Sequence, residues 1–159
     1  MADPNDGAAP AAAGTEAEFS LQGVYLKDCS FEAPNGPRVV GEWNPQISLD
    51  LNTAAETVNA ETREVVLTVS VTAKVNDAVA FLVEVKQAGL FGVRNLSEGD
   101  HRRAIASVAP TVLFPYARAV VSQLVSLGGF PQMLLPPVNF DALYARSLAE
   151  AEAASTARN

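Results

Sequence analysis

Apolar and polar residues alternate most regularly along residues 63–89. In the first part, the odd-numbered positions of residues 65–75 are apolar, and most residues between them are polar. The odd-numbered positions of residues 79–85 repeat this arrangement. Alternation with a period of two and enrichment in β-branched residues are typical of half-buried strands. Asn76 and Asp77 between them tolerate positive φ angles, so the pattern predicts two strands joined by a tight turn.

The parity of the two strands predicts how they pair. A two-residue loop would set odd positions of one strand beside even positions of the other and split the apolar face. A three-residue loop, residues 76–78, pairs Val75 with Val79 and Leu67 with Gln87, which keeps the odd-numbered apolar residues together. We therefore expect an odd-numbered loop.

Two further strands are expected earlier in the chain. Residues 19–28 alternate imperfectly, and residues 29–37 follow with two prolines and an Asn-Gly pair, which indicate a turn. Trp43 opens a strand whose alternation continues to Leu51, and the polar residues 53–62 read as a loose connection. Four strands are enough for one sheet.

Helical patterns take over in the second half of the chain. Ser97 is a candidate N-cap, and Pro115 is expected to begin or bend a longer helix that stops at the pair Gly128 and Gly129. Asn139 is expected to cap a last helix that ends near Leu148. Strands followed by helices predict an α+β fold, a four-stranded antiparallel sheet with two or three helices packed on one face.

Length and composition predict one domain with two tails. The chain has 159 residues, and residues 1–18 lack large apolar side chains apart from the initiating Met, so we expect a disordered tail, a domain over residues 19–148 and a flexible tail over residues 149–159. The net charge of −7 argues against nucleic acid and anionic lipid and favours cationic partners. A hydrophobic content of 48% suggests that apolar surface is used between subunits or with a ligand.

Targeting features are not evident in the sequence. The acidic N-terminus lacks the layout of a signal peptide, and no uninterrupted apolar run approaches the roughly 18 residues of a transmembrane helix. We therefore expect a cytoplasmic protein without direct membrane insertion. The single cysteine, Cys29, excludes an internal disulfide.

Residues suited to catalysis are scarce. His101, the only histidine, sits beside Arg102 and Arg103 and reads as part of a solvated helix face. Cys29 has no CxxC partner, and Asp28 with Glu32 reads as surface charge more than as an acid–base pair. Nucleotide-binding and paired-histidine metal motifs are absent from the sequence. The sequence predicts a protein that is not an enzyme and has no cofactor or metal.

Large apolar residues remain in loops and at strand ends. They either close the core or line a groove for apolar peptide segments, for which flexible Met and Leu beside aromatic walls are suited. The residues of this group are Phe31, Trp43, Leu90, Phe91, Met133, Leu134 and Leu135.

Several motifs, taken together and in order, resemble the protein-export chaperone family SecB. They are Lys27-Asp28, Ser30-Phe31-Glu32-Ala33-Pro34, Trp43 with Pro45, Leu113-Phe114-Pro115-Tyr116-Ala117-Arg118, Gly129-Phe130-Pro131-Gln132, and Pro137-Val138-Asn139-Phe140-Asp141-Ala142-Leu143. The similarity covers residues 19–148, and the tails carry none. One departure is Val83, where some relatives carry cysteine.

The resemblance implies a homotetramer, a dimer of dimers with sheets outside and helices between them. It implies an ATP-independent cytosolic chaperone that binds unfolded secretory precursor proteins and passes them to the translocase motor SecA. The SecA-binding positions of the family match Asp28, Glu32, Leu82 and Glu84. Those of its tetramer contact match Val83, Val85 and Gln87.

Resemblance and pattern together favour a client groove. Its expected residues are Trp43, Ile47, Leu49, Leu51, Phe140 and Leu143, with Phe31 and Phe91 as walls. Two alternatives stay open. One is a SecB-like chaperone dedicated to another client, such as an antitoxin, and the other is a small enzyme with a sheet wrapped around a helix, such as a thioesterase, which would need a catalytic carboxylate or histidine in a closed pocket.

Overall fold

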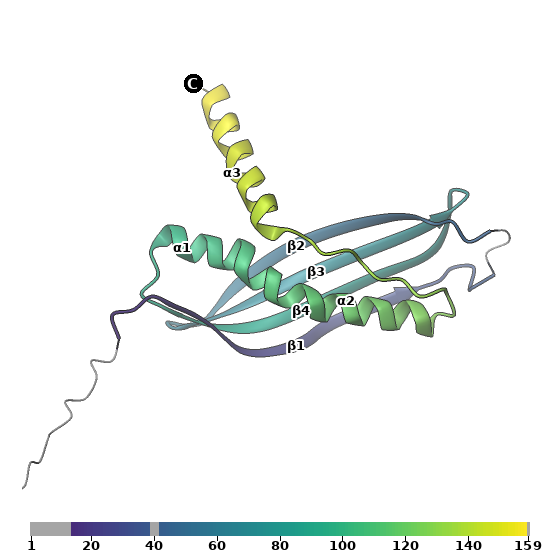
Figure 1. Ribbon diagram of the computed structural model, residues 1–159, viewed down its shortest axis with the longest axis horizontal. Coiled ribbons are helices and arrows are strands. Elements are labelled where there is room, and N and C mark those ends of the chain that lie inside the picture. The colour runs from purple at the N-terminus through teal and green to yellow at the C-terminus, as the bar shows by residue number, and fades with distance from the viewer. Residues whose placement is uncertain (1–13, 39–41, 159) are drawn as a thin grey trace, which may run out of the picture.

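One face of a four-stranded antiparallel sheet carries the long helix, which confirms the predicted α+β class (Figure 1). The computed structural model describes residues 14–38 and 42–158. The strands lie in the order β1-β4-β3-β2. Their bounds are Glu18–Glu32 for β1, Gln46–Asn59 for β2, Thr62–Val75 for β3 and Ala78–Arg94 for β4.

The helices follow the sheet in the chain. Their bounds are Glu98–Arg103 for α1, Ala104–Val108 for the π-helical turn η1, Ala109–Leu127 for α2 and Phe140–Ala157 for α3. Elements α1, η1 and α2 form one continuous helical run, and α2 crosses the sheet mainly over β4 and β3 (Figure 1).

The strands are longer than the sequence pattern predicts. The expected turn at residues 29–37 is wrong in its first part, because β1 continues to Glu32. The expected loose connection at residues 53–62 is wrong as well, because β2 extends to Asn59 and β3 begins at Thr62. Continuous pairing of β1 with β4 and of β2 with β3 holds these polar segments in extended form.

The turn between β3 and β4 has two residues, so the predicted three-residue loop is wrong. Asn76 and Asp77 have φ angles of 49° and 63°, and Val75 pairs with Ala78. Two consecutive positive φ angles define a type I′ turn, whose twist matches that of the strands.

A bulge then restores the predicted register. Ala73 pairs with Phe81 and Lys74 with Val79, which leaves Ala80 as an extra residue in β4. Beyond the bulge Leu67 pairs with Gln87, as predicted. The odd-numbered apolar residues of β3, and Phe81, Val83 and Val85 of β4, therefore face α2. Val79 does not share this face as predicted, because it pairs with Lys74 before the bulge.

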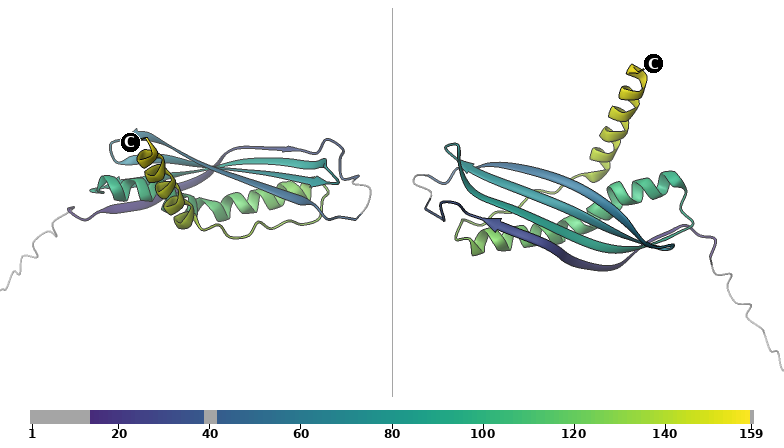
Figure 2. Two further views of the ribbon diagram at one scale, coloured as in Figure 1. Left: turned by 90° about the horizontal axis from the view of Figure 1, so that it is seen from above. Right: turned by 180° about the vertical axis from the view of Figure 1, so that it is seen from behind.

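The core lies between this inner face of the sheet and α2. Helix α2 presents a fully buried apolar residue at every fourth position, and these pack against the odd-numbered residues of β3 and β4 (Figure 2). The helix residues are Leu113, Ala117, Val121 and Val125, and the sheet residues include Val65, Leu67, Val69, Val71, Phe81 and Val85.

Most predicted helix ends are confirmed. The Ser97 hydroxyl caps α1 by accepting from the Asp100 N–H at 3.1 Å, and Asn139 caps α3. Helix α2 ends at Gly128, and the following Gly129 has a φ of 82°. Pro115 lies inside α2 and does not begin it, because the helix already starts six residues earlier.

The last helix differs from the expectation in two ways. It runs to Ala157, so the predicted end near Leu148 is wrong. It also projects away from the sheet (Figures 1 and 2), and only Phe140 is buried among its residues. The predicted tail over residues 1–18 lies largely outside the described residues.

One helical run is long and apolar enough to cross a membrane by length and composition. This run, Glu98–Leu127, has a mean hydropathy of 1.5 in its most apolar window, and 44% of that window is buried inside the chain. The sequence contains no uninterrupted apolar run long enough to cross a membrane. Mean hydropathy gives a different result because apolar core residues raise the average even where polar residues separate them. A core helix gives the same signal, so the run is weak evidence for a membrane span.

Candidate functional site

The four residues predicted to bind SecA lie together on the outer face of the sheet, the face opposite α2. Glu32 in β1 pairs with Leu82 in β4. Glu84 and Asp28 occupy positions of the same face, two and four residues further from this pair along their strands. Alternation places them there because each of these strands turns its neighbouring residues toward α2.

Among the described residues, the carboxylates predicted to bind SecA form no close ion pair, although Lys86 of β4 lies opposite Asp28. These carboxylates belong to Asp28, Glu32 and Glu84. The hydroxyl of Ser70 in β3 donates to Glu84 at 3.3 Å, a neutral contact that leaves the charge in place. The surface therefore offers negative charge to a cationic partner.

At the other end of the outer face, three polar side chains form a cluster. The Tyr25 hydroxyl and the Lys27 ammonium, both from β1, reach across β4 and donate to the Glu64 carboxylate in β3. The hydrogen bond from Lys27 and, to a smaller extent, the hydrogen bond from Tyr25 lower the pKa of the Glu64 carboxylate. The same carboxylate raises the pKa of Tyr25 to about 12. This cluster neutralises Glu64, whereas Asp28, Glu32 and Glu84 lie toward the other end of the sheet.

Two predicted groove residues meet at an aromatic ring that the sequence did not single out. Phe130, just after α2, lies with its ring centroid 5.6 Å from that of Trp43 and 6.3 Å from that of Phe31. Phe81 completes the cluster at 5.1 Å from Phe130. The only sequence signal for Phe130 is an aromatic residue directly after a pair of glycines.

Close packing explains one of those glycines. A β-carbon at Gly128 would lie 2.2 Å from the ring of Phe31, well inside van der Waals contact. The helix end thus approaches the ring closely because Gly128 has no side chain.

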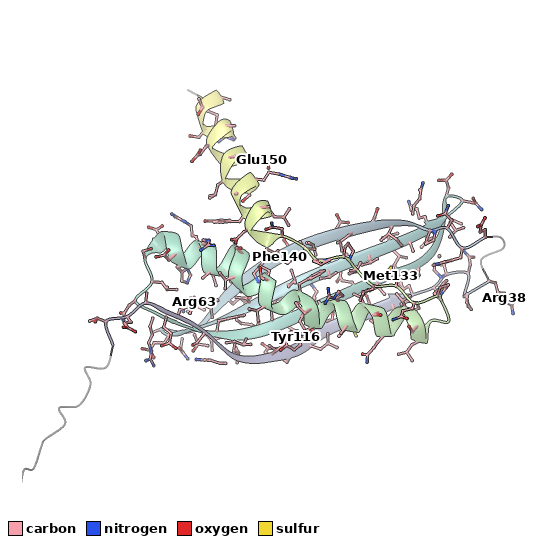
Figure 3. All side chains as sticks on the ribbon, viewed as in Figure 1. Arg38, Arg63, Tyr116, Met133, Phe140 and Glu150 are labelled. Atoms are coloured by element: carbon pink, nitrogen blue, oxygen red, sulfur yellow. The ribbon has the colours of Figure 1, made fainter. Side chains whose placement is uncertain are left out.

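Strand β2 leaves apolar side chains partly open on the inner face. Ile47, Leu49 and Leu51 pair with Ala73, Val71 and Val69 of β3, so they share the face that α2 covers further along the sheet. Leu49 and Leu51 are half-buried, and Ile47 is 42% exposed. The linker between α2 and α3 follows this face between β2 and α2 (Figures 1 and 3), and Met133 of the linker packs against the core.

The first turn of α3 supplies one end of this apolar surface. The ring of Phe140 is buried edge-on against Phe114 of α2, with centroids 5.9 Å apart. Leu143, nearly one turn later, is 41% exposed. The groove residues, defined from here on as the predicted set Phe31, Trp43, Ile47, Leu49, Leu51, Phe140 and Leu143, range from the buried Phe140 to the exposed Ile47 and Leu143.

Phe91 does not belong to this set. It is 1% exposed and stacks on Phe19 with ring centroids 4.9 Å apart. It pairs with Arg63 of β3 and Leu21 of β1, at the opposite end of the sheet from Phe31. Alternation predicts the face on which an aromatic residue lies, but it does not predict whether other parts of the chain cover that end of the strand.

The three residues matched to a tetramer contact lie beneath α2 of their own chain. Val83, Val85 and Gln87 are all buried on the inner face. The Gln87 amide donates to the Tyr25 carbonyl at 2.9 Å, next to the bulge in β1 between Leu26 and Asp28. Their direct effect is to seat α2 and β1.

The outward side of α2 and the adjoining linker combine exposed apolar residues with polar ones. Tyr116, Leu127 and Leu134 are exposed there, and Figure 3 shows Tyr116 on this helix. A shallow hollow beside them lies between α2 and the start of the linker. Its lining residues are Pro115, Arg118, Ala119, Ser122, Gln123, Ser126, Leu127 and Leu134.

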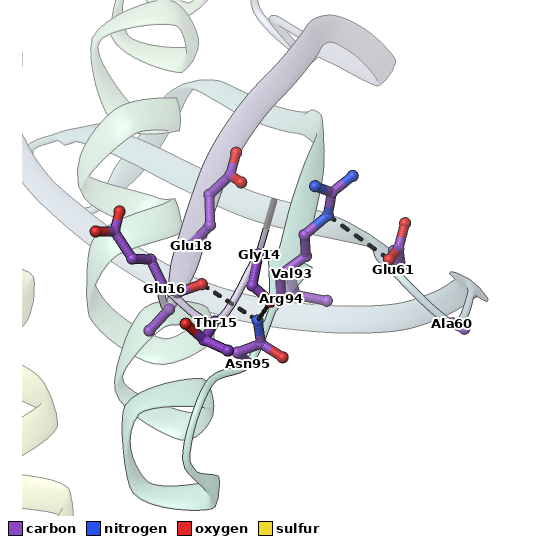
Figure 4. A pocket seen from close by; sticks show the side chains of 10 residues that line it. Gly14, Thr15, Glu16, Glu18, Ala60, Glu61, Val93, Arg94 and Asn95 are labelled. Carbon is purple, nitrogen blue, oxygen red and sulfur yellow. Dashed lines mark hydrogen bonds and ion pairs between the residues drawn. The ribbon is translucent and has the colours of Figure 1, made fainter. Parts of the chain in front are cut away.

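A polar pocket at the far end of the sheet is bordered by the Arg94–Glu61 ion pair and by Asn95, whose amide donates to the carbonyls of Gly14 and Glu16 (Figure 4). Groups of three or more His, Cys, Asp or Glu side chains that could hold a metal do not occur among the described residues. His101 is half-buried, less solvated than predicted.

A solved structure shares this fold. A SecB-like chaperone from Mycobacterium tuberculosis, determined in complex with an antitoxin peptide, superimposes with a TM-score of 0.65 at 16% identity, covering 76% of this chain and 90% of the other. At that identity the likeness concerns the fold.

Sequence comparison places the chain in a family. The model of the preprotein translocase subunit SecB matches residues 12–151. The protein-export protein SecB of Stutzerimonas stutzeri is 45% identical over 96% of this chain and 94% of its own length. The protein-export protein SecB of Pseudomonas aeruginosa is 49% identical over 86% of this chain and 85% of its own length. The chain belongs to the SecB family.

Proposed function

We propose that this chain is an ATP-independent chaperone of the cytoplasm that binds unfolded secretory precursor proteins and delivers them to SecA. The observation that carries the proposal is the contrast between the two faces of one sheet. The inner face has an open apolar groove at β2, and the outer face has unpaired carboxylates at β1 and β4. Membership of the SecB family supports this function.

Client binding would use the groove residues. An unfolded segment that covers Ile47, Leu49 and Leu51 gains roughly 25 cal/mol for each Å² of apolar surface buried. The outer edge of β2 also has unpaired backbone groups with which an extended segment can form hydrogen bonds. Ordering the client opposes both gains, so each contact is weak and a client needs many of them.

A homotetramer would multiply such contacts. The exposed apolar residues of α2 and the adjoining linker, Tyr116, Leu127 and Leu134, fit a contact between subunits. Val83, Val85 and Gln87 would act on that contact indirectly, through the position of α2. Several grooves in one particle raise the effective concentration of binding surface for a single client.

We predict that Leu49→Asp weakens client capture. The substitution places a charge on the inner face, where a client segment would have to desolvate it. Suppression of aggregation of a denatured secretory precursor should fall markedly. The matched control is Ser48→Asp, which adds the same charge one residue away on the outer face. Equal suppression by both variants would remove Leu49 from the groove.

A second candidate function is service to a different client, such as an antitoxin. The observation that favours it is the structural similarity to a SecB-like chaperone solved with an antitoxin peptide. Binding to SecA separates the two, because only the export function needs the acidic outer face.

A further inference from the structure

The first turn of α3 is the part of this helix that is anchored to the rest of the chain. Only Phe140 is buried, and the remaining turns project away from the sheet (Figures 1 and 2). The direction of α3 therefore depends on the contacts of its first turn.

Asp141 makes the polar contacts of that turn. Its carboxylate accepts a hydrogen bond from the Ser107 hydroxyl at 2.6 Å and another from the Arg103 guanidinium at 3.2 Å. Ser107 is 2% exposed, whereas Asp141 is largely exposed. Replacing the carboxylate would therefore leave a buried hydroxyl without its acceptor, which makes this contact costly to lose.

The π-helical turn η1 presents Ser107 to Asp141. In this turn the Ala109 N–H donates to the carbonyl of Ala104, five residues back. The turn holds one residue more than an α-helical turn, which rotates the residues before it by about 100° relative to those after it. Residues before η1 can thus face α3 while α2 faces the sheet. The Thr111 hydroxyl, donating to the Ser107 carbonyl at 2.7 Å, ties η1 to α2.

Element η1 also contacts β2, the strand that carries most of the groove. A contact between η1 and α3 therefore relates the direction of α3 to the groove. Leu143 lies two residues after Asp141, on the same anchored turn.

We propose that Asp141 is a positioning residue of the client groove, which holds α3 against η1 through Ser107 and Arg103 and so sets the place of Leu143. The inference rests on the proposed chaperone function. The ordinary role of an acidic residue in a first turn, compensation of the helix dipole, does not involve Ser107.

Hydrogen exchange on the full-length protein tests the structural half. We expect Asp141→Ala, which removes the acceptor oxygen, and Ser107→Ala each to raise the exchange rates of α3 amides about two- to tenfold, the loss expected for one hydrogen bond. The two changes combined should not add, because they break the same contact. Glu150→Ala is the control, since it removes a carboxylate from an exposed site of α3 (Figure 3). Unchanged exchange in Ser107→Ala would overturn the proposal in favour of the dipole.

A double-mutant cycle on client affinity tests the functional half. The probe is a reduced and carboxymethylated, permanently unfolded polypeptide, and the readout is its dissociation constant. We expect Asp141→Ala and Leu143→Ser each to weaken binding, and the double variant to bind no more weakly than Leu143→Ser alone. A purely structural loss of stability would instead make the two effects additive.

The outcomes separate this inference from the proposed function. If Leu143→Ser binds the probe as the unmodified protein does, the groove assignment fails, and the purpose given to Asp141 fails with it. If Leu143→Ser weakens binding while Asp141→Ala changes neither affinity nor exchange, the groove stands and the positioning role is refuted.

Discussion

Single side chains at the bulged edge strand β1 have roles that composition does not reveal. The bulge at Lys27 interrupts the ladder between β1 and β4, and the chain compensates on both faces. Gln87 satisfies the Tyr25 carbonyl on the inner face, while Glu64 binds Tyr25 and Lys27 on the outer face. A buried glutamine is thus explained by the backbone group that it satisfies.

The Tyr25–Glu64 contact predicts a dependence of stability on alkaline pH. Because the pKa of Tyr25 is raised to about 12 in the folded chain, against 10.0 ordinarily, its contribution is complete below pH 10 and is lost as pH rises toward 12. We expect the free energy of unfolding, measured in urea, to fall between pH 10 and 12 more steeply for the unmodified protein than for Tyr25→Phe.

Tyr144→Phe is the control for that experiment. Tyr144 lies on α3, far along the chain from Glu64, and the substitution removes the same phenol. Parallel curves for Tyr25→Phe and the unmodified protein would show that the contact does not persist in solution.

At the level of elements, the β3–β4 hairpin shows what the sequence can and cannot predict. Alternation correctly predicted both strands, the shared apolar face and the pairing of Leu67 with Gln87. It failed at the loop, because parity can be restored by a bulge as well as by an odd-numbered turn. Ala80, the extra residue, is small and apolar and leaves no mark in the pattern.

The candidate site follows the same division. Alternation placed Leu82 and Glu84 on the outer face, because period-two alternation is a local property, whereas Asp28 and Glu32 joined them only through the family resemblance, since Glu32 was expected in a turn. The aromatic cluster at Phe130 depends on how the segment after α2 returns to the sheet, a long-range contact that no local pattern encodes.

The turn itself predicts a stabilising substitution. Asp77 has a φ of 63°, a conformation that costs an ordinary residue roughly 1–2 kcal/mol and glycine little. Asp77→Gly should raise the free energy of unfolding by up to about 1 kcal/mol, less than the full cost because Asp tolerates this conformation.

Urea denaturation measures that change, and Asp77→Ala is the matched variant. Alanine has neither the freedom of glycine nor a polar side chain to support the turn, so it should lower stability. A glycine variant no more stable than the alanine variant would contradict the type I′ assignment.

At the level of the whole molecule, one sheet separates two kinds of recognition. Exposed apolar side chains lie at the β2 side of the inner face, and unpaired carboxylates lie at the β1 side of the outer face. A client and a cationic partner could therefore bind the same chain at once without competing for the same side chains.

This separation predicts that Glu84→Lys weakens SecA binding without changing client affinity or oligomeric state. The substitution reverses a charge on the outer face, away from α2 and the groove. Binding measured at two salt concentrations should show the loss chiefly at low salt, where surface charges are least screened.

Glu56→Lys is the control for Glu84→Lys. It makes the same charge change on the same face, near the Tyr25–Glu64 cluster at the other end of β2. An equal loss of SecA binding in both variants would attribute the effect to net charge, and dissociation of the oligomer by Glu84→Lys would contradict the assignment of that face.

The single additional alanine in β4, Ala80, determines both which acidic side chains of this strand are exposed and which apolar side chains are buried. If Ala80 paired regularly with Ala73 instead of bulging out, every later residue of β4 would slip by one step along β3. Glu84 would then point at α2, and Val83 and Val85 would meet water. A register shift in this hairpin therefore cannot change the surface offered to partners without also changing the hydrophobic core.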